Sequence, residues 1–162
     1  MKSLRLFLLF FIPLSFIPAQ FYTGMKSLGG SISYSKLYYD KEENYSILNI
    51  QPTLSYFVQD NVSVGVSVNR ISIMNQRNTQ TLTGAGVGFK LYFSTVYVGG
   101  SYFTKKWDGD KKPSDNILGE AGYLAELSQH VYLDFGVDYW KGLNEMENTE
   151  SFTVGVGVIT IF

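Results

Sequence analysis

Eight segments that alternate apolar and polar side chains follow one another along this sequence, with little helical periodicity. Each segment is longer than ten residues, which suits a tilted β-strand that crosses the hydrocarbon core of a bilayer. Their cores span residues 27–37, 46–58, 62–73, 81–93, 96–107, 117–127, 131–141 and 151–162. This alternation predicts strands with one apolar and one polar face.

Short and long connections alternate between these segments. The tight turns are 59–61, 94–95 and 128–130, and the longer polar connections are 38–44, 74–80, 108–116 and 142–150. In an up-and-down antiparallel sheet, alternate connections lie at opposite ends, so all tight turns should gather at one end. An even number of strands brings both mature termini to that end. This layout is that of an outer-membrane barrel with short periplasmic turns, which makes both termini periplasmic.

The polar face of these strands carries small and charged residues together. Residues 131–139, for example, alternate aliphatic or aromatic side chains with Tyr132, Asp134, Gly136 and Asp138. This mixture fits a narrow barrel interior. The charged residues expected inside are Lys90, Lys105, Glu120, Glu126, Asp134 and Asp138. Because buried charges must pair, we expect a salt-bridge network that fills the lumen and leaves no open pore; a proton or ion path is the alternative.

Residues 96–107 alternate less clearly, and we expect Val96, Val98, Gly100 and Tyr102 to point outward. Aromatic residues of the outward faces gather near the strand ends. Those near the tight turns are Tyr56, Phe89, Phe93 and Phe162, and those near the long loops are Tyr34, Tyr102, Tyr139 and Phe152. Two aromatic girdles around an aliphatic band match the two interfaces of a bilayer.

Residues 1–19 have a different character from the rest of the chain. Lys2 and Arg5 precede a mostly apolar run that ends at Ile17, and Ala19 supplies a small residue for cleavage. This pattern is typical of a secretory signal peptide, and the run is too short to span a bilayer as a helix. We therefore predict an exported protein whose single domain, the barrel, covers residues 20–162.

Composition narrows the chemistry that the chain can perform. The sequence has no cysteine and a net charge of −1, so thiolate sites are excluded and nothing suggests nucleic acid as a partner. The single histidine, His130, falls in a tight turn at the expected periplasmic end. The carboxylates of residues 108–115 lack EF-hand spacing and lie beside lysines. We predict no catalytic residue, no cofactor and no metal site.

The final strand should pair with the first, because an open sheet edge cannot face lipid. Its outward face carries Val154, Val156, Val158 and Phe162. This pattern resembles the β-signal of bacterial outer-membrane proteins, although Thr160 stands where a large apolar residue is usual. The resemblance implies that these four residues form an assembly signal, read by the barrel-assembly machinery.

Residues 50–68 combine Pro52, the pair Tyr56 and Phe57, a turn at Asp60 and Asn61, and Gly65. This hairpin resembles that of small outer-membrane β-barrel proteins of the Bacteroidetes type. In size and topology the chain is also similar to the OmpX and OmpA-transmembrane class. These resemblances imply a Gram-negative surface protein whose partners are outer-membrane lipid and lipopolysaccharide.

The sequence thus predicts an all-β fold, an eight-stranded antiparallel up-and-down transmembrane β-barrel with a structural or surface-interaction role. Two alternatives stay open. One is a barrel enzyme that hydrolyses or transfers acyl chains of lipid A, for which His130 lies at the wrong end of the barrel. The other is a soluble secreted barrel that binds a ligand, which would need a mostly apolar interior.

Overall fold

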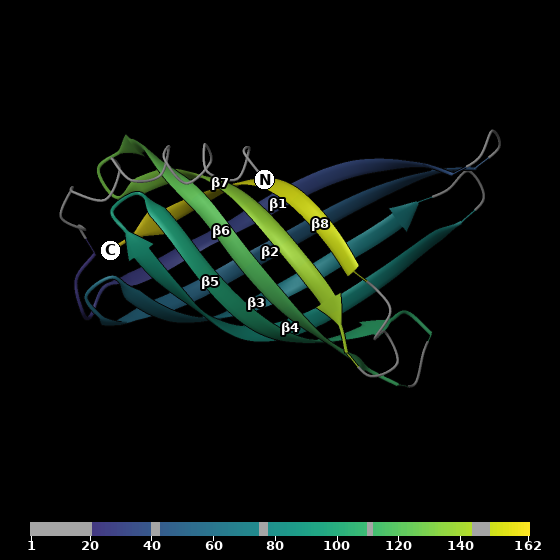
Figure 1. The fold of residues 1–162 in the computed structure, drawn as a ribbon, viewed down its shortest axis with the longest axis horizontal. Coiled ribbons are helices and arrows are strands. Elements are labelled where there is room, and N and C mark those ends of the chain that lie inside the picture. Colours follow the sequence, from purple (N-terminus) through teal and green to yellow (C-terminus); the bar gives the residue numbers. More distant parts are fainter. Residues whose placement is uncertain (1–20, 40–42, 75–77, 110–111, 144–149) are drawn as a thin grey trace, which may run out of the picture.

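Eight antiparallel strands form one closed barrel in the computed structural model of the protein (Figure 1). The structure describes residues 21–39, 43–74, 78–109, 112–143 and 150–162. The predicted fold class is confirmed, whereas the predicted signal peptide lies outside the described residues. No described helix is long and apolar enough to cross a membrane.

The strands are β1 (Lys26–Tyr39), β2 (Glu43–Gln59), β3 (Val62–Met74), β4 (Thr79–Phe93), β5 (Val96–Trp107), β6 (Ser114–Ser128), β7 (Val131–Gly142) and β8 (Glu150–Ile161).

The barrel closes where β8 pairs with β1. Their register runs from Ser27 opposite Ile161 to Ile32 opposite Val156. At the rim, Lys26 and Phe162 exchange both backbone hydrogen bonds, with N···O distances of 2.7 and 2.9 Å. The two edges of the sheet thus satisfy each other along this stretch, as the pairing predicted from the sequence requires.

The tight turns gather at one end of the barrel and the longer connections at the other (Figure 1). Each tight turn has one residue in the left-handed backbone region, namely Asn61, Ser94 and His130 with φ values of 66°, 62° and 70°. Two of the turns are preceded by a register shift, between Phe57 and Gln59 and between Glu126 and Ser128. A bulge combined with a left-handed residue lets a short hairpin turn while the strands keep their twist.

Strands at the long-loop end continue further than the sequence predicted. The ladder between β1 and β2 stays in register up to Tyr39 opposite Glu43, so residues 38, 39, 43 and 44 of the expected loop belong to the strands. Similarly, β6 begins at Ser114 instead of 117. The apolar alternation ends earlier than the backbone pairing does, because polar residues outside the apolar band can still form ladder hydrogen bonds.

Side-chain exposure is inverted relative to a soluble barrel. On the outer wall Val87 and Val154 are 59% and 68% exposed, whereas Asn69 and Lys105 on the inner face are 0% and 3% exposed. The predicted faces of β3, β4 and β7 are confirmed. In β5 the expected orientation also holds, because Val98 and Tyr102 are exposed and the residues that alternate with them are not.

Two apolar clusters occupy different levels of the lumen. The larger, at the tight-turn end, contains Phe21, Phe57, Tyr92, Tyr97, Leu124, Tyr132, Ile159 and Ile161. The smaller, toward the long loops, contains Phe103, Leu118 and Trp140. Along β7 the inward positions run from Tyr132 through Asp134, Gly136 and Asp138 to Trp140. A polar layer therefore lies between the two clusters.

Candidate functional site

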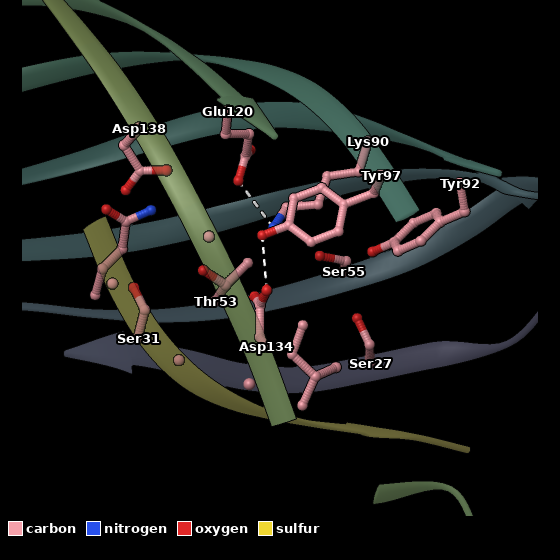
Figure 2. A pocket seen from close by; sticks show the side chains of 16 residues that line it. Ser27, Ser31, Thr53, Ser55, Lys90, Tyr92, Tyr97, Glu120, Asp134 and Asp138 are labelled. Carbon is pink, nitrogen blue, oxygen red and sulfur yellow. Dashed lines mark hydrogen bonds and ion pairs between the residues drawn. The ribbon is translucent and has the colours of Figure 1, made fainter. Parts of the chain in front are cut away.

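The candidate site is this polar layer, which we call the central chamber. Asp134 and Asp138 reach it from β7, Glu120 from β6 and Lys90 from β4 (Figure 2). The strand period of two directs all of these side chains inward. Hydroxyl groups from β1 and β2 complete the lining, namely those of Ser27, Ser31, Thr53 and Ser55.

An ion pair between Lys90 and Glu120 lies along one side of the chamber, with 2.8 Å between Nζ and Oε2. The two side chains are only 16% and 8% exposed, so the pair is shielded from water. Lys90 and Glu120 lie on either side of Gly99 in the sheet register. A Cβ at Gly99 would lie 3.0 Å from Glu120 Cγ and 2.6 Å from the carbonyl oxygen of Phe89. The absence of a side chain there leaves room for the pair.

Asp134 has a different partner. The Tyr97 hydroxyl donates a hydrogen bond to Asp134 Oδ1 at 2.8 Å, and the Tyr97 ring lies 4.2 Å from Lys90 Nζ (Figure 2). Asp138 faces the same space but forms no hydrogen bond or ion pair with any residue in the described part of the chain. Three carboxylates therefore share the chamber with one ammonium group. The sequence named all four of these charged residues, and the structure brings them together.

The empty space inside the chamber is small. One cavity of about 40 Å³ lies among Ser27, Lys90, Asp134 and Asp138. A second cavity of about 20 Å³ lies beside it and also touches Lys90. Because one water molecule needs about 10–15 Å³ by this measure, the chamber has room for a few waters and for no organic ligand.

Lys105 does not reach the carboxylates, contrary to the prediction. Its Nζ lies 3.4 Å from the centroid of the Trp140 ring and 5.6 Å from that of Phe103. Trp140 occupies the next inward position after Asp138 on β7, and the stem of Lys105 packs across Gly84. The buried ammonium is therefore held by a cation–π contact in the smaller apolar cluster instead of an ion pair.

Glu126 also lies outside the chamber. It has the predicted inward phase on β6, but it is exposed at the tight-turn end, opposite Tyr132 and beside the register shift. The prediction that it joins the charge network is therefore wrong. The larger apolar cluster lies between this rim and the chamber, so Glu126 keeps its contact with water.

Residues 21–25 close the tight-turn end, a role that the sequence analysis did not predict. The Phe21 ring is 4% exposed, and its centroid lies 5.4, 5.0 and 5.8 Å from those of Phe57, Tyr92 and Tyr132. The backbone N–H of Asn61 donates to the Phe21 carbonyl at 3.0 Å. The only signal in the sequence was the aromatic pair Phe21 and Tyr22 ahead of the first strand, and a segment without periodicity does not show which of the two points inward.

A turn carboxylate fixes this N-terminal segment. The Thr23 N–H and hydroxyl donate to Asp60 Oδ1 at 2.8 and 2.9 Å. These hydrogen bonds, the backbone one first, hold the pKa of Asp60 below its ordinary value. The Asp60–Asn61 turn thus both reverses the chain and anchors the segment that covers the barrel mouth.

The four residues of the predicted assembly signal share the outer face of β8. Val154, Val156, Val158 and Phe162 are 68%, 44%, 47% and 60% exposed. Phe162 lies at the rim beside Lys26, where it takes part in barrel closure. This placement is the one that recognition from outside the wall would need.

The described residues offer few groups for catalysis. His130 is exposed in the turn between β6 and β7. Within the described ranges, no group of three or more histidine or carboxylate side chains is arranged to hold a metal ion, and this includes the chamber carboxylates. The chemistry that the chamber residues show is ion pairing and hydrogen bonding.

No protein-family model and no curated protein sequence matches the chain. The solved structure of the outer membrane protein Ail from Yersinia pestis, in phospholipid bilayer nanodiscs, is similar with a TM-score of 0.56 and 12% identity, over 86% of this chain and 99% of that one. The outer membrane protein OprG from Pseudomonas aeruginosa gives 0.52 and 10%, over 90% and 99%. A de novo designed transmembrane β-barrel gives 0.52 and 13%, over 86% and 97%. The chain therefore has the fold of small transmembrane β-barrels, which confirms the expected resemblance at the level of fold.

Proposed function

We propose that the protein is an integral outer-membrane β-barrel with a structural or surface-interaction role and no open pore. The observation that carries the proposal is the inverted wall, with exposed aliphatic and aromatic side chains outside and charged or hydroxyl side chains inside. Soluble monomers rarely expose contiguous apolar patches larger than a few hundred Å². The barrel also pairs its first and last strands from Ser27 opposite Ile161 to Ile32 opposite Val156, so no open edge remains along that stretch, as crossing lipid requires.

Two aromatic girdles support the position of the barrel in a bilayer. Phe93 and Phe162 are exposed at the tight-turn end, and Tyr34, Tyr139 and Phe152 are exposed toward the long loops. Contrary to the prediction, Tyr56 and Phe89 flank Val64, and Tyr102 is a diagonal neighbour of Phe89, so these three lie between the two ends. Aromatic residues favour the membrane–water interfaces. In known barrels the short turns face the periplasm, so we infer that both mature termini are periplasmic and the longer loops external.

The packing of the lumen supports the absence of a pore. The larger apolar cluster, with Phe21 over its mouth, fills the tight-turn end, and Phe103 and Trp140 pack at the other level. Between them lie the small cavities of the central chamber. The lining of this chamber argues against a soluble barrel that carries an apolar ligand, because charged and hydroxyl side chains surround its small cavity.

The partners that we propose are outer-membrane lipid and lipopolysaccharide around the wall, and the barrel-assembly machinery at β8 during biogenesis. For the latter, the outward row of Val154, Val156, Val158 and Phe162 would be the recognised surface. A non-enzymatic role is supported by the position of His130, which is exposed in a tight turn and thus far from the external leaflet in this orientation.

The test is expression of the full chain in a Gram-negative host. The protein should fractionate with the outer membrane and show heat-modifiable migration in detergent gels. A cysteine at Asp108 should react with an impermeant reagent on intact cells, and one at Gln129 should not. Recovery of a soluble periplasmic monomer would overturn the membrane proposal, and the opposite labelling would overturn the orientation. Unchanged acyl composition of lipid A with and without the protein is expected; a change would favour the enzyme.

A further inference from the structure

The outer wall has a hollow that the proposed function leaves unexplained. Two depressions of about 1,110 and 540 Å³ lie over the strands from β1 to β6. Both are lined by Leu54, Val66, Val87 and Tyr102, so they are two lobes of one depression, which we call the outer hollow. Ligand pockets typically have volumes of about 300–1,000 Å³. The outer hollow is therefore large enough for acyl chains.

Close approach of strands shapes the floor of the outer hollow. Gly65 and Gly88 face the lumen and are direct cross-strand partners. A Cβ at Gly65 would lie 2.8 Å from the carbonyl oxygen of Leu54, and one at Gly88 would lie 2.9 Å from that of Gly100. Such glycines let the backbones of neighbouring strands approach closely on the lumen side of the wall beneath the outer hollow. Gly100 extends the floor, because it points outward without a side chain.

Two cations stand at the long-loop end of the outer hollow. Along β3 the outward residues run from Val64 through Val66 and Val68 to Arg70, and along β5 they run from Gly100 through Tyr102 and Thr104 to Lys106. Arg70 and Lys106 are both direct neighbours of Thr83 on β4, on either side of it. Both are exposed, and neither forms an ion pair with a described residue.

Cations on the lipid-facing side of a wall are unfavourable unless an anion or water receives them. Lysine or arginine there costs about 2–4 kcal/mol at the bilayer midplane and about 0–1 kcal/mol near the interface. Arginine and lysine are the residues that bind phosphate with charge-assisted hydrogen bonds. Arg70 and Lys106 lie on the two strands that flank Thr83, so two phosphate-binding side chains stand at the level where the apolar wall ends.

The length of the outer hollow fits one leaflet. From Val64 to Arg70 the strand advances six residues, or about 20 Å at 3.3 Å per residue. With a strand tilt of about 40°, this corresponds to about 15 Å along the membrane normal, which is half of a hydrocarbon core of about 30 Å. A phosphorylated lipid held at Arg70 and Lys106 would extend its chains down the outer hollow to the bilayer midplane.

We propose that the outer hollow binds one molecule of lipopolysaccharide, with a lipid A phosphate on Arg70 and Lys106 and acyl chains in the two lobes. This inference rests on the proposed function, because the outer hollow meets lipid A only if the barrel spans the outer membrane with its long loops outside. Several acyl chains on one phosphorylated head fit two adjoining lobes below a pair of cations. The alternative source of the same chemistry is an anionic phospholipid.

The experiment measures retention of purified lipopolysaccharide by the full barrel refolded in detergent, counted as bound molecules per protein by native mass spectrometry. One lipopolysaccharide should bind the wild type in preference to phosphatidylglycerol. Replacing Arg70 and Lys106 together by glutamine should weaken binding at least about tenfold, as expected when charge-assisted contacts are lost. Lys141→Gln is the matched control, since it removes a cation at the long-loop end of β7, outside the lining of both lobes, and should leave binding unchanged.

A second pair of variants tests the lobes. Ala85→Phe should fill the smaller lobe and reduce retention, whereas Ala121→Phe, which is outward and exposed on β6 but outside the lining, should not. Equal binding by the Arg70 and Lys106 variants and by Lys141→Gln would overturn the inference, as would equal retention of phosphatidylglycerol. Heat-modifiable insertion into vesicles of phospholipid alone is measured in parallel. Insertion without lipopolysaccharide binding refutes only this inference, and failure to insert refutes the proposed function and the inference with it.

Discussion

Replacing Lys90 by methionine is the sharpest test of the central chamber. The change keeps most of the side-chain volume and removes the only ammonium group among Glu120, Asp134 and Asp138 of the described lining. Loss of one partner of a buried ion pair typically costs about 3–5 kcal/mol. The cavities of about 40 and 20 Å³ can admit water to the stranded carboxylates. We therefore expect a loss of about 3 kcal/mol, at the lower end of that range.

The assay is urea unfolding in detergent micelles at neutral pH, followed by tryptophan fluorescence. With a slope of about 2 kcal/mol per molar urea, the midpoint should fall by about 1.5 M. Lys141→Met is the matched control, because Lys141 and Glu150 form an ion pair of 3.7 Å whose side chains are 44% and 55% exposed. Such exposed pairs contribute about 0–1 kcal/mol. A shift for Lys90→Met no larger than that of the control would refute the description of the chamber as a buried charge network.

A double-mutant cycle separates the direct partner of Lys90 from its neighbours. Adding Glu120→Gln to Lys90→Met should recover most of the lost stability, since the 2.8 Å ion pair is then removed as a unit. Adding Asp134→Asn should recover less, because Asp134 is already hydrogen-bonded by Tyr97. Strict additivity in the first cycle would mean that Lys90 and Glu120 act independently, against the geometry.

The remaining predictions concern the tight-turn end. Phe21→Ala should destabilise the barrel by up to about 3–5 kcal/mol and speed amide exchange at the mouth, whereas Tyr22→Ala, at an exposed position, should do neither. Because the pKa of Asp60 is lowered from 3.8, its anchoring of Thr23 is complete above that pH and is lost as pH falls through the lowered value; Thr23 amide protection should follow this titration and become pH-independent in Asp60→Asn. Deleting Phe162 should reduce the assembled level in cells more than the stability of refolded barrel, and an unchanged assembled level would contradict the signal.

Much of the wall could be predicted because membrane barrels make both faces of a strand informative. In β3, Val62, Val64, Val66 and Val68 alternate with small or polar residues. A lipid-facing apolar exterior and a polar lumen together explain this long alternation. A half-buried strand of a soluble protein gives the same period, but its exposed face would not be the apolar one. The turn lengths then fixed which end of each strand meets which end of its neighbour.

Depth and partners inside the lumen could not be predicted from the period. Glu126 and Glu120 have the same phase on β6, yet a register shift at the turn and the larger apolar cluster leave one at the rim and the other in the chamber. The Nζ of Lys105 contacts the face of Trp140 instead of a carboxylate. The period alone cannot predict this contact, because it depends on which side chains lie opposite each other across the lumen. Phe21 lies in a segment without any period, so its direction depends on the turn at Asp60 and Asn61 that holds it.

The charged residues of the chamber also help to specify the register of the strands. In this respect they differ from the charged residues on the outer wall. A shift of one residue in β4 would send Lys90 into lipid and Phe89 into the lumen, and the same shift in β7 would send out both Asp134 and Asp138. Each charge that reaches the midplane costs up to about 2–4 kcal/mol, so misregistered barrels are disfavoured even if the chamber binds nothing. Arg70 and Lys106 have no such explanation, because the native register itself places them outside. An inward charge can be justified by folding alone, whereas an outward pair at the end of an apolar hollow calls for an anion, and that difference is why the outer wall, more than the lumen, is where we expect a ligand.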